Sequence, residues 1–370
     1  NDTVRIRILS GEVRQGMLDT ISPNSAAPIG LSKNLILHVH GGGFIAHSSK
    51  SHEIYLKPWC KELKVPIVSI DYSLAPEHVF PRASEECFYV YAWCLLNKNL
   101  LGWSGENIIC VGDSAGGVLA TNIVQRAIVN QIRIPDALVP IYSPFLLTYS
   151  LSPSRLLSVM DPLLNLGILW RCLAAYSGID FKAETERYKI MLNLGEIKKI
   201  DEKNSNVRFS KSESIDLPDE VKIGSQEKVK ISLENLDNRI DLADVQPEFQ
   251  SDKLLTNEEL LSYYELMGDA IFLIDKLRSN RVPYDHYMSP ILSTDDMLSK
   301  FPKTFLISAC LDPLHDDSIE FKRRLNRLHV PNGLEVIEGV HHGFLNFVQI
   351  SKECRKASKL VTSRIKSYLI

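Results

Sequence analysis

The sequence feature that most restricts the fold is a serine between two glycines, placed where a strand is expected to turn into a helix. Residues 112–116 read Gly-Asp-Ser-Ala-Gly. The apolar run at 107–111 is typical of a buried parallel strand, and a helical pattern begins at residue 118. In such a turn the side chain of Ser114 is pushed out of the sheet, with a helix N-terminus behind it that favours negative charge. The motif therefore predicts an α/β sheet with a candidate serine nucleophile at its edge.

Strand-like and helix-like patterns alternate on both sides of this turn, which predicts a mostly parallel sheet covered by helices. The alternation occupies residues 34–145 and resumes at residue 304, so we expect one sheet built from both ends of the chain. Pro140 counts against a strand at 137–141, because proline lacks a backbone donor. The expected strands are 35–39, 67–70, 107–111, 137–141, 304–310 and 334–337, and the expected helices are 54–63, 83–96, 318–328 and 353–368.

Residues 181 to about 283 differ in character from the rest of the chain. They are rich in Lys, Glu, Asp, Asn and Ser and show no strand alternation. Such a composition buries too little apolar surface to offset the entropy of ordering, so we expect a polar, mobile insertion. Within it, residues 256–277 carry a capping box and an apolar face, which predict a helix.

A serine hydroxyl is a weak nucleophile and requires a base, an orienting acid and donors for the oxyanion. Residues 40–43 read His-Gly-Gly-Gly and follow an expected strand. Consecutive glycines let the backbone approach a bound oxygen and point N–H groups at it. We expect the N–H groups of Gly42, Gly43 and Ala115 to form an oxyanion hole. The alternatives are a flexible turn and a phosphate-binding loop, and the second lacks its Gly-Lys-Ser/Thr sequence here.

Candidates for the acid and the base follow in the later part of the chain. Asp312 comes directly after an expected strand, at the sheet edge where ligands gather. Its rivals Asp316 and Asp317 are better explained as first-turn residues of the next helix. For the base, His341 and His342 both follow the last expected strand, and position alone does not choose between them. The glycine after His342 would permit a tight turn at that residue.

Composition and patterning argue against several other classes of function. The 370 residues carry a formal net charge of -3 and no basic stripe, so no nucleic-acid partner is expected. Seven cysteines are scattered through apolar runs, which indicates buried thiols in a reducing compartment, and no spacing predicts a metal site. The longest apolar run, 163–176, contains Arg171 and is too short to span a bilayer. Because the sequence begins with Asn1 and shows no leader, we expect a fragment of a longer chain.

Four motifs resemble the signatures of the hormone-sensitive lipase family of α/β-hydrolases. They are His-Gly-Gly-Gly at 40–43, Gly-Asp-Ser-Ala-Gly-Gly at 112–117, Asp-Pro-Leu at 312–314 and His-Gly-Phe at 342–344. A fifth motif at 71–77 is similar to the family's structural support behind the oxyanion loop. Residues 51–53, 85–88 and 152–164 narrow the resemblance to the animal members, which carry a long regulatory insertion where this chain has its polar segment.

The resemblance implies an α/β-hydrolase fold with a helical lid segment and a long, largely disordered regulatory insertion. The lid is expected at 160–176, as a helix whose apolar side chains line an acyl pocket. The implied domains are a first part of the catalytic domain at 1–180, the insertion at 181–283 and the remainder of the catalytic domain at 284–370.

The resemblance also assigns a catalytic triad to Ser114, Asp312 and His342, and a supporting role in the oxyanion loop to His40 and Gly41. The implied reaction is hydrolysis of lipid esters through an acyl-enzyme, with no metal or organic cofactor. The implied substrates are diacylglycerol, triacylglycerol, monoacylglycerol, and cholesteryl and retinyl esters.

For location and partners, the resemblance implies a cytoplasmic protein that associates peripherally with lipid droplets or membranes, and it admits a homodimer. It further implies control by a regulatory kinase. Ser210, Ser212 and Ser214 lie beside basic residues and are candidate phosphorylation sites. For any one of them a solvated linker is the simpler interpretation, whereas phosphoregulation is favoured for the segment as a whole.

Two other functions compete with this interpretation. A carboxylesterase for small substrates would use the same triad. A non-enzymatic ligand binder on a hydrolase fold is disfavoured, because Ser114, Asp312 and His342 are all present.

Overall fold

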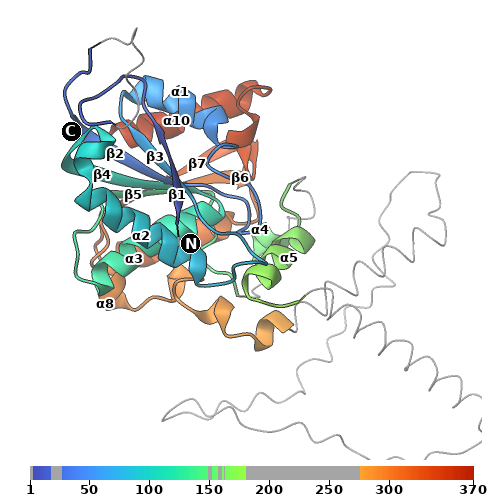
Figure 1. The fold of residues 1–370 in the computed structure, drawn as a ribbon. Coiled ribbons are helices and arrows are strands. Elements are labelled where there is room, and N and C mark those ends of the chain that lie inside the picture. The colour runs from blue at the N-terminus through green and yellow to red at the C-terminus, as the bar shows by residue number, and fades with distance from the viewer. Residues whose placement is uncertain (1–2, 18–26, 149–151, 157–160, 162, 181–275) are drawn as a thin grey trace, which may run out of the picture. The chain divides into compact units, whose positions relative to one another are not determined.

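A seven-stranded sheet forms the centre of the described part of the chain, in a computed structural model that describes residues 3–17, 27–148, 152–156, 161, 163–180 and 276–370 (Figure 1). The strand order is β1-β3-β2-β4-β5-β6-β7, and every neighbouring pair is parallel except β1 with β3. This confirms the predicted sheet, mostly parallel and built from both ends of the chain. The strands are β1 (Arg5–Leu9), β2 (Ser32–Val39), β3 (Ile67–Asp71), β4 (Trp103–Asp113), β5 (Ala137–Ile141), β6 (Lys303–Leu311) and β7 (Asn332–His341).

Helices cover both faces of this sheet, with α1 and α10 on one face and α2 and α3 on the other (Figure 1). The strands alternate between the two cores, as their geometry requires. In β2, Leu35 and Leu37 belong to the cluster that contains α2 and α3, and Ile36 belongs to the cluster that contains α1 and α10. The helices are α1 (Glu53–Leu63), α2 (Arg82–Leu96), α3 (Ala115–Val129), α4 (Pro153–Leu156), α5 (Leu166–Tyr176), α8 (Asp295–Leu298), α9 (His315–Arg327) and α10 (Lys352–Lys366).

Two strands show what a local pattern can and cannot predict. The strand expected at 137–141 is present with those bounds, and Pro140 lies opposite Gly112 in the parallel register. By contrast, β7 extends well beyond the predicted 334–337. Because β7 is an edge strand, most of its residues are partly exposed and the apolar run that signals a strand is short.

The helix predicted over 160–176 is shorter than expected, because α5 begins only at Leu166. Asn165 has an extended backbone, and its side chain accepts a hydrogen bond from the Ile168 N–H at 3.0 Å, which starts the helix there. Asp161 and residues 163–165 therefore lie outside the helix.

Most of the predicted insertion, including the expected helix at 256–277 as far as residue 275, lies outside the described residues. Its last residues, 276–283, are described and pack on the domain that carries the sheet. Residues 276–279 are helical, and Leu277 is buried in the core beside α2 and α3.

The carboxyl ends of the parallel strands bring four predicted site segments to one edge of the sheet. His40 follows β2, Ser114 follows β4, Asp312 follows β6 and His342 follows β7. In open α/β sheets this edge is where ligands bind, because the loops that leave parallel strands converge there. In the described part of the chain, no helix has the length and apolarity needed to cross a membrane.

Candidate active site

The turn between β4 and α3 holds Ser114 in a backbone conformation that few residues adopt. Its φ is 53° and its ψ is -125°, and its N–H donates to the Ile141 carbonyl at 2.8 Å. The two flanking glycines are required by sterics. A Cβ on Gly112 would lie 2.2 Å from the Gly116 oxygen, and one on Gly116 would lie 2.1 Å from the Val39 oxygen. The predicted tight turn is present, and it places the Ser114 side chain at the edge of the sheet where the parallel strands end.

Three predicted residues form one series of hydrogen bonds. The Ser114 Oγ lies 2.9 Å from His342 Nε2, and His342 Nδ1 lies 2.9 Å from Asp312 Oδ2. The other oxygen of Asp312 accepts the Leu314 N–H at 2.7 Å. His342 and Asp312 are both buried. This is the geometry in which an imidazole can take a proton from a hydroxyl while a carboxylate orients it.

The charge environment of His342 favours its protonated form. Burial by itself would lower the pKa of His342, but the charge and hydrogen bond of Asp312 outweigh it, with smaller contributions from Asp161 and Asp113. The net effect raises the pKa of His342 above its ordinary value. An imidazole in this environment can hold a proton taken from a neighbouring hydroxyl.

The rival candidates make contacts elsewhere. Asp316 accepts the Ser154 N–H at 2.8 Å, and Asp317 forms a buried ion pair with Arg155 at 2.9 Å. Both lie in the first turn of α9, as expected. The His341 ring lies against its own main chain, with Nδ1 2.6 Å from the His342 carbonyl oxygen. The structure thus brings Asp312 and His342 to Ser114.

The glycine loop after β2 lies beside Ser114, where the oxyanion donors were predicted. Gly42 and Gly43 have φ angles of 118° and 61°, and both line the same cavity as Ser114 and Ala115. Neither glycine has space for a side chain: a Cβ on Gly42 would lie 2.1 Å from the Ala46 oxygen. The loop can therefore place backbone N–H groups close to a bound oxygen.

His40 supports this loop from behind. Its Nδ1 donates to the Gly41 carbonyl at 2.7 Å, and its ring stacks on Tyr72 with centroids 4.2 Å apart. The Tyr72 hydroxyl in turn donates to the His40 carbonyl at 2.9 Å. Burial lowers the pKa of His40 to about 3, so the ring is a neutral structural group.

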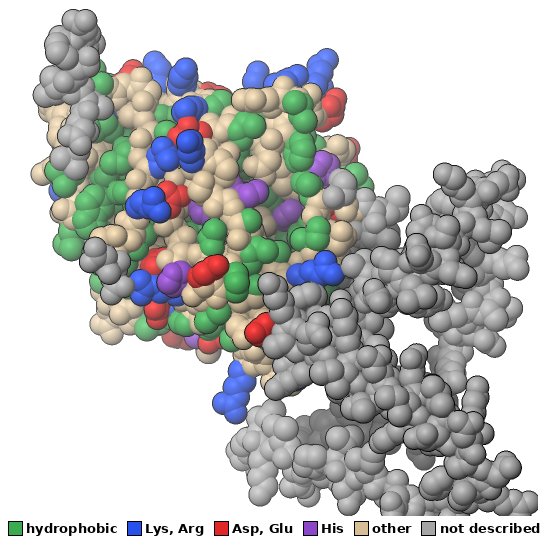
Figure 2. Space-filling view, turned by 45° about the vertical axis from the view of Figure 1, so that its right-hand side comes forward, with side chains coloured by type: hydrophobic (Ala, Val, Ile, Leu, Met, Phe, Trp, Pro, Cys, Tyr) green, Lys and Arg blue, Asp and Glu red, His purple; other side chains and the backbone are tan. Residues whose placement is uncertain are grey.

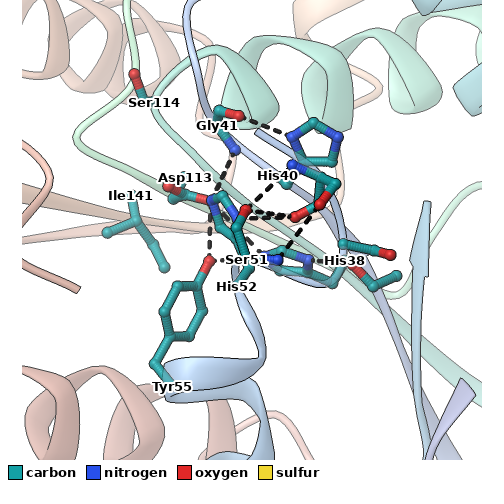
Figure 3. A network of polar contacts seen from close by, with 12 residues as sticks. His38, His40, Gly41, Ser51, His52, Tyr55, Asp113, Ser114 and Ile141 are labelled. Atoms are coloured by element: carbon teal, nitrogen blue, oxygen red, sulfur yellow. Dashed lines mark hydrogen bonds and ion pairs between the residues drawn. The ribbon is translucent and has the colours of Figure 1, made fainter. Parts of the chain in front are cut away.

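A buried carboxylate that sequence reasoning left without a role joins this loop to the serine turn. Asp113 immediately precedes Ser114, and its Oδ1 accepts the Gly41 N–H at 3.0 Å and the Tyr55 hydroxyl at 2.9 Å (Figure 3). His52 Nε2 lies 3.3 Å from the same oxygen. In Figure 3 the side chain of Ser114 points away from this network. Asp113 thus holds the first glycine of the loop against the end of β4.

The electrostatics of the network favour an ionised Asp113. Burial would raise the pKa of Asp113, but His52 and His38 outweigh it and hold the pKa well below its usual range. His52 gains from the same interaction: burial would lower its pKa, but Asp113 raises it above the ordinary value. Local patterns gave this group no role, because its members come from β2, from α1 and the turn before it, and from β4. The available signals are the position of Asp113 inside the serine motif and that of His52 in the motif at 51–53.

An apolar cavity of about 280 Å³ opens at the serine. One wall comes from α5 and the turn before it, where the lid was predicted. These segments supply Leu163, Leu164, Ile168, Leu169, Cys172 and Leu173. Phe44, Ile45, Leu147 and Leu314 complete the apolar lining, and Ser114 and His342 lie at its polar end. The apolar lining thus extends up to Ser114 and His342.

Among the described residues, no group of three or more His, Cys, Asp or Glu side chains is arranged to hold a metal ion. This includes the histidines around Asp113, whose ring nitrogens face protein hydrogen-bond partners. His38, for example, lies 2.9 Å from both Ser69 Oγ and Tyr55 Oη. The candidate phosphorylation sites Ser210, Ser212 and Ser214 lie outside the described residues.

Comparisons with known proteins identify the fold and the family of the chain. The family model for the alpha/beta hydrolase fold matches residues 36–198 and 237–346. Hormone-sensitive lipase of Mus musculus is 32% identical over 99% of this chain and 60% of its own length, and that of Homo sapiens is 32% identical over 99% of this chain and 42% of its own length. A hyperthermophilic esterase from the archaeon Pyrobaculum calidifontis has the same fold, with a TM-score of 0.63 and 22% identity over 98% of this chain and 81% of its own.

The fold and the comparisons define the class as α/β-hydrolases. The chain belongs to the hormone-sensitive lipase family, as the motifs predicted. It spans 60% of the mouse relative and 42% of the human one.

Proposed function

We propose that this chain is a serine lipase that hydrolyses lipid esters through an acyl-enzyme. The observation that carries the proposal is the hydrogen-bond series from Ser114 through His342 to Asp312, which opens on an apolar cavity beside a glycine loop. The 32–34% identity to hormone-sensitive lipases supports it.

In the proposed acylation step, His342 Nε2 takes the proton of Ser114 as the Oγ attacks the ester carbonyl carbon. The negative charge that develops on the carbonyl oxygen is stabilised by the N–H groups of Gly42, Gly43 and Ala115. Asp312 remains ionised and stabilises the imidazolium. His342 then gives the proton to the departing alcohol oxygen, which leaves the acyl group on Ser114.

Deacylation repeats these steps with water as the nucleophile. His342 removes a proton from water, the hydroxide adds to the acyl carbon, and the same N–H groups stabilise the oxyanion. The bond to Ser114 breaks as His342 returns the proton to its Oγ. A fatty acid leaves and the free enzyme is restored.

The apolar lining of the cavity supports lipid esters as the substrate class. Leu163, Ile168 and Ile45 line it and are also 36–39% exposed, so they form an apolar rim through which a chain longer than the cavity can extend. The proposed substrates are acylglycerols, cholesteryl esters and retinyl esters. We further propose peripheral contact of this rim with a lipid droplet or membrane surface in the cytoplasm.

Charged side chains do not dominate the view in Figure 2, where Lys, Arg, Asp and Glu are interspersed with hydrophobic side chains on the described part of that face. A mixed surface of this kind supports a weak, peripheral contact better than a strong electrostatic one.

The test compares the wild-type chain with Ser114→Ala on a short soluble ester, emulsified diacylglycerol and a cholesteryl ester. All three substrates should be turned over by the wild type, and the substitution should lower kcat by roughly 10⁴-fold or more, because the nucleophile is lost. Equal activity of the variant would overturn the mechanism. Turnover confined to the short ester would favour the alternative function, a carboxylesterase for small substrates. The cavity volume of about 280 Å³ supports that candidate, because this volume lies at the small end of the range for ligand pockets.

Regulation by phosphorylation and assembly into a homodimer complete the proposal. The candidate sites are Ser210, Ser212 and Ser214. Their joint replacement by Ala should abolish stimulation by a kinase that recognises basic residues near serine. Stimulation that persists in the triple variant would exclude these sites.

A further inference from the structure

One buried carboxylate connects the wall of the cavity to the catalytic histidine. Asp161 is 5% exposed, and its Oδ1 accepts the N–H groups of Leu163 at 2.8 Å and Leu164 at 2.7 Å. Its Oδ2 accepts the backbone N–H of His342 at 3.2 Å. Leu163 and Leu164 line the cavity, whereas His342 belongs to the hydrogen-bond series with Ser114. The mechanism described above assigns Asp161 no part.

The stretch that precedes Asp161 is attached to the other side of the same site. The Ser154 hydroxyl donates to the Pro313 carbonyl at 3.0 Å, next to Asp312, and the Ser154 N–H donates to Asp316 at 2.8 Å. These contacts anchor α4 on the loop after β6. Asp161 supplies the contact to the loop after β7.

The charge of Asp161 has a second effect, on the protonation of His342. The groups that face His342 are the carboxylates of Asp312 and Asp113, the Tyr142 ring with its centroid 5.0 Å away, and Asp161. Burial by itself lowers the pKa of His342, and Asp161 is one of the groups that raise it. A carboxylate that accepts the main-chain N–H of the base stabilises the imidazolium that forms when Ser114 attacks.

We propose that Asp161 is a positioning residue for the ester hydrolysis proposed above: it fixes the main chain of His342 relative to the cavity wall, and its charge stabilises the imidazolium of the acylation step. Because Leu163 and Leu164 depend on the same carboxylate, Asp161 couples the seating of the acyl chain to the alignment of the base. The expected loss of ester hydrolysis rests on the proposed function, whereas the expected effect on the pKa of His342 does not.

The decisive variant is Asp161→Asn in the full chain. The amide keeps the size of the side chain but has one acceptor oxygen and no charge, so it cannot serve both the turn at 163–164 and His342. We expect kcat on a short soluble ester to fall by up to about 10²-fold, because the base is misaligned. The acid limb of kcat/KM should move to lower pH. Asp161→Glu restores the charge on a longer stem and should keep the acid limb near that of the wild type while kcat stays reduced.

Asp316→Asn is the matched control, because it removes a carboxylate that anchors the same stretch without a contact to His342. It should leave the acid limb unchanged. An acid limb that stays at the wild-type pH in Asp161→Asn, or that moves equally in Asp316→Asn, would overturn the proposal.

Titration of the His342 ring by NMR separates this inference from the proposed function. In Asp161→Asn the ring should titrate at lower pH than in the wild type, whether or not any ester is hydrolysed. An inactive wild-type chain would contradict the proposed function, but the titration of His342 could still be compared between the wild type and the variant. An unchanged titration of His342 in an active, folded Asp161→Asn variant would contradict the proposed role of Asp161 and leave the proposed function standing.

Discussion

At the scale of single residues, the site depends on backbone conformations that side chains rarely tolerate. Ser114, Gly42 and Gly43 all have positive φ angles. Each such conformation at a residue with a side chain costs of order 1–3 kcal/mol, and it persists only where surrounding contacts hold it. For Ser114 that contact is the N–H bond to Ile141, and for the loop it is the bond from Gly41 to Asp113. The strain lies where a bound ester would meet the backbone.

Gly43→Ala should lower kcat by roughly 10²-fold, the loss expected when an oxyanion donor is displaced. The added Cβ would lie 2.6 Å from Cys172 Sγ, so the Cys172 side chain, the loop or α5 must shift. Gly178→Ala is the control: Gly178 also has a positive φ, of 76°, but the nearest atom to its added Cβ is 3.6 Å away. Kinetics on a short ester should therefore separate the two variants. Equal losses would show that backbone strain rather than the clash is responsible.

The pH dependence of activity should report the environment of His342. The proposed mechanism requires the neutral ring, and the raised pKa of His342 means that the ring stays protonated to a higher pH than an ordinary histidine. The acid limb of kcat/KM should therefore have its midpoint above 6.5. Asp312→Asn should move it downward and reduce kcat by roughly 10⁴-fold. A wild-type midpoint below 6.5 would contradict this account.

At the scale of elements, α5 has one face in the core and another at the cavity. Trp170 is 2% exposed and packs in the core, whereas Ile168 is 39% exposed and lines the cavity. Because Ile168 is only partly buried, its substitution should change substrate binding more than stability.

Ile168→Asp should reduce kcat/KM for long-chain esters and leave short esters nearly unaffected, because only a long chain must pass the introduced charge. Leu156→Asp makes the same change on α4 at a residue that is 60% exposed and does not line the cavity. Leu156→Asp should leave kcat/KM unchanged for both long-chain and short esters. Unaltered long-chain hydrolysis in Ile168→Asp would exclude α5 from the acyl path.

Elements with a strong local signal could be predicted from sequence, and those defined by distant contacts could not. The buried strands and the order of Ser114, Asp312 and His342 follow from apolar runs and motifs. The start of α5 depends on the cap by Asn165, which a continuous apolar run conceals. The role of Asp113 depends on partners from α1 and the glycine loop, so it becomes visible only when those elements are brought together.

At the scale of the whole molecule, side-chain hydrogen bonds join segments that lie far apart in the sequence. The Asn34 side chain donates to the Ile370 carbonyl at 3.0 Å and accepts from the Asn107 side chain at 2.6 Å. Asn107 also donates to the Tyr368 carbonyl. Buried amides of this kind hold the segment after α10 against the start of β2 and β4.

Asn34→Ala should lower the free energy of unfolding by about 1–3 kcal/mol, because it leaves buried hydrogen-bonding groups without their partner. Asn130→Ala removes an exposed amide that donates to the Arg126 carbonyl and should change stability by less than about 0.5 kcal/mol. Urea unfolding measures both. Equal stability of the two variants would mean that the hydrogen bonds of Asn34 contribute nothing to the free energy of unfolding.

The assembly of one sheet from both ends has a consequence for the protein while it is being made. Ser114 and His342 are separated by 228 residues. At the usual pace of translation, roughly 5–20 residues per second, the histidine emerges roughly 10–45 s after the serine. During that interval the nascent chain contains Ser114 but not the imidazole that the proposed mechanism requires. If the proposed mechanism holds, an incomplete chain on the ribosome does not hydrolyse esters before the segment after the last strand has been made.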